Sequence, residues 1–230
     1  MQVGPQLPDR TTTAVVGLIS HNDETAYRRE ISHLEVWCQE NHLLLNVSKT
    51  KELIVDFRKQ QRSLHPLLIS GSEVESVDTF RYLGVTISQD LTWTQHITTT
   101  VKKARQRLYL LRRLRDFKLP LRVLKNFYTC TIDSILCGSI TMWMGNCTKQ
   151  DLLALKRVVR SAARTTRTTL PNLQDIYVER CRSRAKRSHP AHSLFSPLPS
   201  GRRFRCLRTK TERLKKSFFP LAVHLLNSEH

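Results

Sequence analysis

Short apolar runs of strand length characterise the first third of the chain. Residues 14–19, 43–47 and 52–57 are rich in β-branched and aliphatic residues, and polar segments separate them. Residues 67–69 precede a glycine turn, and residues 79–87 form a further apolar run. The pattern predicts three strand pieces followed by β-hairpin pairing.

One predicted helix interrupts these strands, over about residues 23–41. Asn22 is its expected N-cap. Its apolar stripe, at helical spacing, is Tyr27, Ile31, Leu34 and Cys38. A polar turn over residues 48–51 separates two of the strands. The first third is therefore predicted to be a small sheet with a helix packed on it.

From Thr92 onward the apolar positions recur at helical spacing. The longest predicted helix has one stripe, formed by Ile97, Val101, Ala104, Leu108 and Leu111. A second helix should begin near Pro120, because proline is favoured in a first turn. Its expected inward side chains are Leu121, Leu124, Tyr128, Ile132 and Ile135.

Sequence signals also locate the later helices. Thr148 and Asp151 have capping-box spacing at the start of a third helix. Its apolar stripe is Leu152, Leu155, Val159 and Ala162, and its outer side carries Lys156, Arg157, Arg160 and Arg164. A short helix is expected over residues 173–180, and a last one should begin near Thr211 and break or kink at Pro220.

Charge divides the chain at the same place as the hydrophobic pattern. Residues 1–92 contain 9 Lys and Arg against 12 Asp and Glu, whereas residues 93–230 contain 29 against 7. The formal net charge of the whole chain is +19. A near-neutral first part followed by a strongly basic second part predicts an acidic polymer as partner. Nucleic acid is the first candidate and an anionic membrane surface the second.

The predicted helix over residues 97–115 carries a dense group of cations, mostly off its apolar stripe. Between residues 92 and 127, ten Lys and Arg are offset by one acid, Asp116. Such a run can be a solvated surface, but the lack of acidic partners favours phosphate contact that is salt-sensitive and blind to sequence. The cations expected to bind nucleic acid are Lys102, Lys103, Arg105, Arg112, Arg113 and Arg115, with Arg107 on the same helix.

Aromatic side chains in the helical region could stack on bases, as in many single-strand binders. The candidates are Tyr109, Phe127, Tyr128 and Trp143. Because these positions follow the core spacing of the helices, core packing is predicted for each of them.

The segment over residues 181–213 is rich in Arg, Ser and Pro, so it is predicted to be extended or disordered without a partner. Within it Arg202, Arg203 and Arg205 surround Phe204, a composition that suits RNA or DNA and equally a nuclear-import patch. A nearby histidine pair, at residues 189 and 192, is interpreted as a polar loop rather than a metal site.

Six scattered cysteines form no CxxC pair, and no histidine stands at zinc-finger spacing from them. Reduced thiols, no metal and no cofactor are therefore expected. The first residues lack the apolar segment of a signal peptide, and no apolar window approaches the roughly 18 residues of a membrane span. An intracellular protein, nuclear or cytoplasmic, is expected.

Three stretches, in order, resemble the C-terminal part of the reverse transcriptase of non-LTR (LINE-type) retrotransposons: ENHLLLNVSKTKELIVDF (40–57), FRYLGVTI (80–87) and residues 198–228. The resemblance implies that residues 14–57 end a polymerase palm and that Lys49 matches a lysine approaching the nucleotide phosphates. A plain polar turn is the alternative for Lys49. The implied primer-grip hairpin contains Phe80, Tyr82, Leu83 and Gly84, and residues 92–164 would be a helical thumb.

In that family an aromatic-Ala-Asp-Asp turn, holding two Mg²⁺ ions, should stand immediately before AVVG. The corresponding positions here are Thr11 and Thr12, whose hydroxyls carry no charge, and Asp9 is displaced by two residues. The resemblance therefore implies a catalytically incompetent remnant of an RNA-directed DNA polymerase, without its Mg²⁺, that at most binds nucleic acid non-specifically.

Residues 98–146 also resemble the short helical segment at the N-terminus of the eighth AlkB homologue, a tRNA-modifying protein with dioxygenase and methyltransferase parts. The iron site of such a dioxygenase needs His-x-Asp with a distant His, and the nearest counterpart is His33-Leu34-Glu35 on a predicted helix. No glycine-rich loop follows a strand to bind a methyl donor. This resemblance implies an RNA- or protein-binding module.

An α+β fold in three parts is expected. Residues 1–92 would form the small α/β remnant of a palm with its hairpin, and residues 93–180 a mainly helical, basic, thumb-like region. Residues 181–230 would form an irregular basic arm. The preference between DNA and RNA and the oligomeric state are left open.

Overall fold

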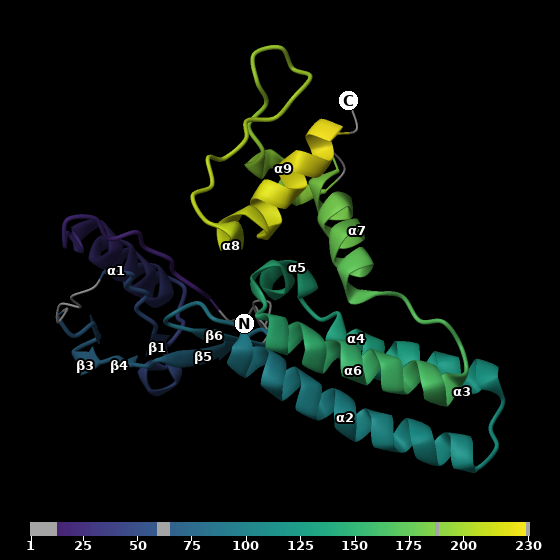
Figure 1. Cartoon of the computed structure of the whole chain (residues 1–230). Helices are drawn as coiled ribbons and strands as arrows, with labels where there is room; N and C mark the ends of the chain where they lie inside the picture. The colour runs from purple at the N-terminus through teal and green to yellow at the C-terminus, as the bar shows by residue number, and fades with distance from the viewer. Residues whose placement is uncertain (1–12, 59–64, 187–188, 229–230) are drawn as a thin grey trace, which may run out of the picture. The chain divides into compact units, whose positions relative to one another are not determined.

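The computed structural model describes residues 13–58, 65–186 and 189–228 of the chain (Figure 1). Helices dominate and the strands are short, which confirms the α+β class. Contacts between residues divide the chain into two compact units, Met1–Phe80 and Arg81–His230. Each unit is described by itself.

The first unit has one helix and a small core. Helix α1 (Thr25–Glu40) packs on β2 (Leu68–Ile69), which pairs antiparallel with β3 (Ser72–Glu73). Strand β1 (Lys51–Glu52) pairs in parallel with β4 (Glu75–Ser76). The buried core of this unit is Ile31, Leu67, Ile69 and Val74. The predicted helix and its packing on strands are confirmed, with Ile31 and Cys38 buried and Tyr27 and Leu34 half-buried.

The predicted strands of the first unit are mostly wrong. Described residues 13–19 contain no strand, and Val16 and Leu18 are 94% and 93% exposed. Residues 43–46 are irregular and lead into the 3-10 helix η1 (Val47–Lys49), while β1 keeps only the start of the third predicted strand. A strand is stabilised by a hydrogen-bonded neighbour and a buried face, and the two-stranded sheets here offer neither to these runs.

The predicted cap of α1 is also wrong. Asn22 lies in a turn with φ of 62°, and the helix begins after Glu24, whose side chain makes no capping hydrogen bond. Asp23 supplies the local acceptor instead, because its Oδ1 accepts a hydrogen bond from the Thr25 amide at 2.9 Å.

The hairpin at residues 79–88 is confirmed. Strands β5 (Thr79–Tyr82) and β6 (Val85–Ser88) form a two-stranded sheet, and the unit boundary falls within β5. Leu83 and Gly84 connect them with φ of 47° and 84°. Two successive positive φ values are the signature of a type I′ turn, which matches the right-handed twist of paired strands.

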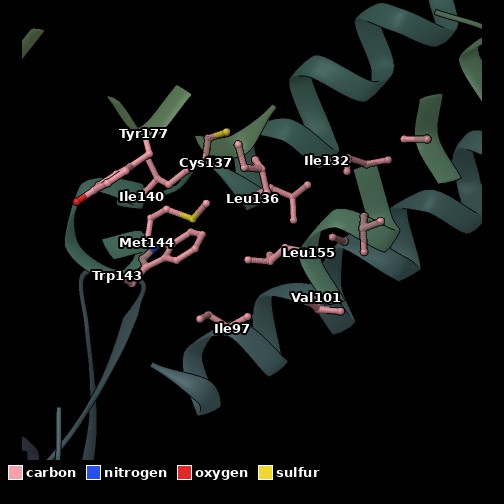
Figure 2. Packing of buried hydrophobic residues seen from close by; sticks show 14 of the residues in the cluster. Ile97, Val101, Ile132, Leu136, Cys137, Ile140, Trp143, Met144, Leu155 and Tyr177 are labelled. Carbon is pink, nitrogen blue, oxygen red and sulfur yellow. The ribbon is translucent and has the colours of Figure 1, made fainter. Parts of the chain in front are cut away.

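Three helices of the second unit pack against one another. Helix α2 (Thr94–Asp116) packs chiefly on α6 (Lys149–Thr166), and α3 (Leu121–Phe127) contacts both. Between α3 and α6 the chain forms the π-helix η2 (Tyr128–Asp133) and the short segments α4 (Ser134–Leu136), α5 (Ile140–Trp143) and η3 (Met144–Asn146). All five residues of the predicted α2 stripe are buried. Figure 2 shows that side chains from α2, α4, α5 and α6 converge in this core.

The π-helix changes which side chains face the core. Leu124, Tyr128 and Ile132 are buried as predicted, but Leu121 is exposed and Leu136 is buried in place of Ile135. In an α-helix with 3.6 residues per turn, residues spaced four apart rotate gradually around the helix axis. The wider turn of a π-helix offsets this rotation, so residues spaced four apart remain on the same side of the helix.

Helices α2 and α6 run in parallel, and their first turns are tied together. The predicted capping box is confirmed: the Asp151 amide donates to Thr148 Oγ1 and the Thr148 amide to Asp151 Oδ2. The same buried carboxylate accepts a hydrogen bond from Thr94 Oγ1 at 3.1 Å. Near the other ends of the two helices, Arg112 Nη2 donates to Ser161 Oγ at 2.8 Å.

The C-terminal part packs around a second cluster of buried residues: Ala185, Phe195, Phe204, Ala222 and Val223. Helix α7 (Leu173–Ala185) is longer than predicted, and the 3-10 helix η4 (Pro190–Leu194) follows it. Helix α8 (Glu212–Lys215) begins after Thr211 as expected. The helical segment is broken as predicted, but at residues 216–217 rather than at Pro220, which lies in the first turn of α9 (Phe218–Ser228).

The basic segment between α7 and α8 is irregular, as its composition predicts, but it is anchored. Phe195 and Phe204 are 4% and 9% exposed. Asn227 of α9 holds Phe204 at both backbone groups: its Oδ1 accepts from the Phe204 amide at 2.8 Å, and its Nδ2 donates to the Phe204 carbonyl at 3.1 Å. Among the described residues, no helix is long and apolar enough to cross a membrane.

His96 gives the second unit a pH-dependent stability. Its ring is buried between Trp93 and Trp143, and its Nδ1 accepts a hydrogen bond from the Thr86 amide at 3.3 Å. Burial lowers the pKa of His96 below its ordinary value, and nearby Lys103 and Arg81 lower it further.

The free energy of unfolding should therefore fall as the pH drops below about 6.5, because the unfolded chain then takes up a proton that the folded one resists. The slope contributed by one histidine is at most about 1.4 kcal/mol per pH unit. Urea denaturation at pH 7.5, 6.0 and 5.0 measures it, and His96→Gln should flatten the curve, whereas His33→Gln, at an exposed site, should not. Equal slopes for parent and His96→Gln would contradict the prediction.

Candidate nucleic-acid interface

The seven cations predicted on the long basic helix all lie on α2 and are all exposed. A second stripe, here called the basic stripe, lies beside the buried one. It is formed by Lys102, Arg105 and Arg112, each of which comes one residue after a buried residue of α2. Arg113 borders this stripe. Lys103 and Arg107 lie toward the opposite edge of the helix, and Arg115 lies beyond the last buried residue of α2.

Few acidic groups offset these cations. The described part of α2 contains one ion pair, between Arg115 and Asp116 at 3.2 Å. Arg112 is held by the Ser161 hydroxyl, and the Arg113 guanidinium lies 5.7 Å from the centre of the Phe117 ring. Neither contact neutralises charge. Positive potential therefore persists along the helix, which is the condition for binding phosphate.

Helix α6 adds cations that sequence reasoning placed on a separate surface. Ser161 of α6 accepts a hydrogen bond from Arg112, so this side of α6 faces α2. Arg157 and Arg164 lie one turn before and after Ser161, along the same side of α6. Both are exposed. We name this surface the α2–α6 face and define it by Lys102, Arg105, Arg112, Arg113, Arg157 and Arg164. The sequence signal for its α6 part is that Arg157, Ser161 and Arg164 precede the buried Val158, Ala162 and Thr165 by one residue each.

The aromatic residues of this region separate into two groups. Tyr128 and Trp143 are 2% and 1% exposed and Phe127 is half-buried, so the prediction of core packing is confirmed for Tyr128 and Trp143. For Tyr109 it is wrong, since 61% of this residue is exposed. The physical reason is its register: Tyr109 follows the buried Leu108 by one residue and so lies on the basic stripe rather than on the apolar one.

The arginines of the C-terminal segment belong to another part of the second unit. Arg202, Arg203 and Arg205 are exposed around buried Phe204, on a turn closed by the Pro197–Phe204 bridge. They lie on the second buried cluster, whereas α2 packs in the first. Their binding to nucleic acid stays a prediction.

The residues implied by the reverse transcriptase resemblance have these positions. Lys49 ends η1 with an exposed side chain, and its amide donates to Asn46 Oδ1 at 3.1 Å. In the β5–β6 hairpin, Phe80 and Tyr82 are half-buried, while Leu83 and Gly84 form its exposed tip. Thr11 and Thr12 lie outside the described residues. The roles that the resemblance implies for these residues stay predictions.

The described residues contain no group of three or more His, Cys, Asp or Glu that could hold a metal ion. Of the candidate iron motif, His33 is exposed and Glu35 Oε1 accepts a hydrogen bond from the Ser70 hydroxyl at 3.1 Å. The six cysteines are free thiols. Burial raises the pKa of Cys137 and Cys147 to about 12 and that of Cys181 to about 11, so these three thiols stay protonated and weakly nucleophilic near neutral pH.

The family model described as "Alkylated DNA repair protein alkB homolog 8, N-terminal" matches residues 93–134 of the chain. The match begins immediately before α2 and covers α2, α3 and η2. No curated protein and no solved structure matches. The match agrees with the second resemblance seen in the sequence, and nothing in the comparisons corresponds to the reverse transcriptase. Over these residues, well under half of the chain, the protein is similar to that N-terminal domain.

Proposed function

We propose that the second unit is a non-catalytic nucleic-acid-binding module that contacts the phosphate backbone through the α2–α6 face. The observation that carries this proposal is the pairing of two parallel basic helix edges, with exposed cations and a single ion pair on the described part of α2. Phosphate contacts of this kind bind strongly at low salt and carry no sequence information.

The similarity to the N-terminal domain of the alkB homologue supports this proposal. The matched residues include α2, which supplies four of the six cations of the face. The name of that family refers to a protein that repairs alkylated DNA. A domain attached to a repair enzyme can serve it by binding nucleic acid, even if the domain has no catalytic groups of its own. We propose this role for the second unit, acting on RNA or DNA.

The test compares two charge reversals of equal size. Arg105→Glu with Arg157→Glu removes one cation from each helix of the face, whereas Arg122→Glu with Lys125→Glu reverses two exposed cations of α3. Both residues are exposed on α3 and are not among the residues that define the α2–α6 face. The face variant should bind a fluorescein-labelled 20-nucleotide oligonucleotide roughly tenfold or more weakly than the parent. Its salt slope should be shallower by about 0.7 for each phosphate that it no longer neutralises.

Fluorescence anisotropy at 50 and 200 mM NaCl measures both quantities for RNA and for DNA. The α3 variant should stay within about threefold of the parent, since it changes the net charge equally but not the face. Absence of binding by the parent at 50 mM NaCl would overturn the proposed function. Equal reductions in affinity in the two variants would show attraction by net charge alone and would overturn the α2–α6 face as the site.

A further inference from the structure

Tyr109 is the large aromatic side chain on the basic stripe of α2. Along the helix it lies seven residues after Lys102 and six before Arg115, which is about 10 Å and about 9 Å at 1.5 Å per residue. Its neighbours on the helix surface at i−4, i+3 and i+4 are Arg105, Arg112 and Arg113. A phenol ring thus stands in the middle of the cations that are proposed to hold phosphates.

The faces of this ring are open. Tyr109 is 61% exposed, and in the described part of the chain no aromatic ring or cation is stacked on it. Two neighbouring guanidinium groups are held elsewhere: Arg112 donates to Ser161 on α6, and Arg113 lies over Phe117 at 5.7 Å. Two of the three neighbouring arginines that could have covered the ring by cation–π contact are therefore engaged beside it.

An exposed aromatic ring among phosphate-binding cations discriminates between forms of nucleic acid. In a duplex, bases are stacked on each other inside the helix, so a protein surface reaches phosphates and groove edges. In a single strand a base can leave its neighbours and stack on an aromatic side chain, a contact that tolerates any base.

We propose that Tyr109 is a stacking platform for an unpaired base and makes the α2–α6 face prefer single-stranded nucleic acid over duplex. The inference rests on the proposed function and adds a substrate class to it. Cations before and after Tyr109 along α2 bind phosphates of the nucleic-acid backbone. The Tyr109 ring stacks on a base that lies between these phosphates. Specificity arises for strandedness and not for sequence, because every base offers a π face.

The test uses the full chain and three labelled probes: a uridine 20-mer, an abasic 20-mer with the same number of phosphates, and a 20-base-pair duplex. The parent should bind the uridine strand more tightly than the abasic strand by about five- to 150-fold, the range expected for one stacked base. Tyr109→Ala should lose this preference while its affinity for the abasic strand and the duplex stays within about twofold of the parent. Tyr109→Phe, which keeps the ring, should retain it.

Leu110→Ala is the matched control, since Leu110 is the next residue, 41% exposed, and outside the basic stripe. It should leave all three affinities unchanged. Circular dichroism melts check that each variant is folded, as the exposure of both side chains predicts. A direct signal comes from Tyr109→Trp in a Trp37→Phe background, where the uridine strand should quench tryptophan emission and the abasic strand should not.

The outcomes separate the two proposals. If the parent binds in a salt-dependent way but Tyr109→Ala keeps the preference for the uridine strand, the stacking inference is overturned and the proposed function stands. If the parent binds the uridine and abasic strands equally, the inference is overturned in the same way. If the parent binds none of the probes at low salt, both fail.

Discussion

Replacing Gly145 with alanine should destabilise the second unit by about 3 kcal/mol and release the segment around α8 from it. Gly145 lies in η3, where a Cβ atom would overlap the Lys216 carbonyl oxygen and stand 2.7 Å from the Tyr177 hydroxyl. Both separations are far below van der Waals contact. The main clash is with backbone, so no side-chain rotation relieves it.

The expected destabilisation is large because a tertiary hydrogen bond forms next to Gly145. Buried Tyr177 donates its hydroxyl hydrogen to the Lys216 carbonyl at 2.8 Å. Moving Lys216 breaks this bond and displaces the start of α9, from which Phe218 and Leu221 pack against the first core cluster. Urea denaturation should show the lower stability, and limited trypsin digestion should cut more rapidly after Arg208 and Lys210.

Gly138→Ala is the control for this substitution. Its Cβ would meet its nearest neighbour, the Ser134 carbonyl oxygen, at 3.4 Å, which is ordinary contact. We expect a change in unfolding free energy within about 0.5 kcal/mol. If Gly145→Ala were as stable as Gly138→Ala and resisted trypsin equally, the close approach of η3 to Lys216 would be wrong.

Leu111→Ala should cost about 3 kcal/mol and also weaken nucleic-acid binding. Leu111 is fully buried in the first core cluster, in the register between Leu108 and the C-terminal turn of α2. Truncation leaves a cavity beneath the part of the helix that presents Arg112 to Ser161. The pairing of α2 with α6 should loosen there, so the two rows of cations should no longer be held together.

The neighbouring leucine provides the comparison. Leu110 is 41% exposed, so Leu110→Ala should change the unfolding free energy by less than about 1 kcal/mol and leave binding intact. Urea denaturation gives the stabilities, and oligonucleotide anisotropy at a temperature where both variants are folded gives the affinities. Equal costs for the two leucines would mean that the register of α2 is wrong and that the basic stripe does not lie beside the apolar one.

Local pattern predicted the helical part of this protein well. The α2 stripe, the capping box at Thr148 and the start of α8 after Thr211 depend on residues within a few turns of each other, so the sequence contains the full information for them. The strands were predicted poorly for the opposite reason. Residues 14–19 have the composition of a buried strand, yet a strand also needs a distant partner, which the described part of the chain does not provide.

The candidate site was also predicted only in part from the sequence. The cations of α2 and their exposure followed from the spacing of apolar residues. Tyr109 was predicted in the core because it was assigned to the core spacing of the helix, although a one-residue offset from Leu108 places it among the arginines. That offset was available in the sequence. The engagement of Arg112 beside the ring was not, because it depends on contact with another helix. The contact of Arg113 with Phe117 joins residues four apart and is local to the end of α2.

The sequence by itself determined where the longest helices of this protein lie, which sides of those helices are apolar, and that the positive charge gathers after residue 92. These properties follow from helical periodicity and from charge, which are local or additive. The tertiary structure alone decided that α2 and α6 lie in parallel, tied by Thr94 to Asp151 at one end and by Arg112 to Ser161 near the other. That packing joins two separate basic runs into one face, because side chains about 50 residues apart in the chain can share a surface only once the core between their helices is formed.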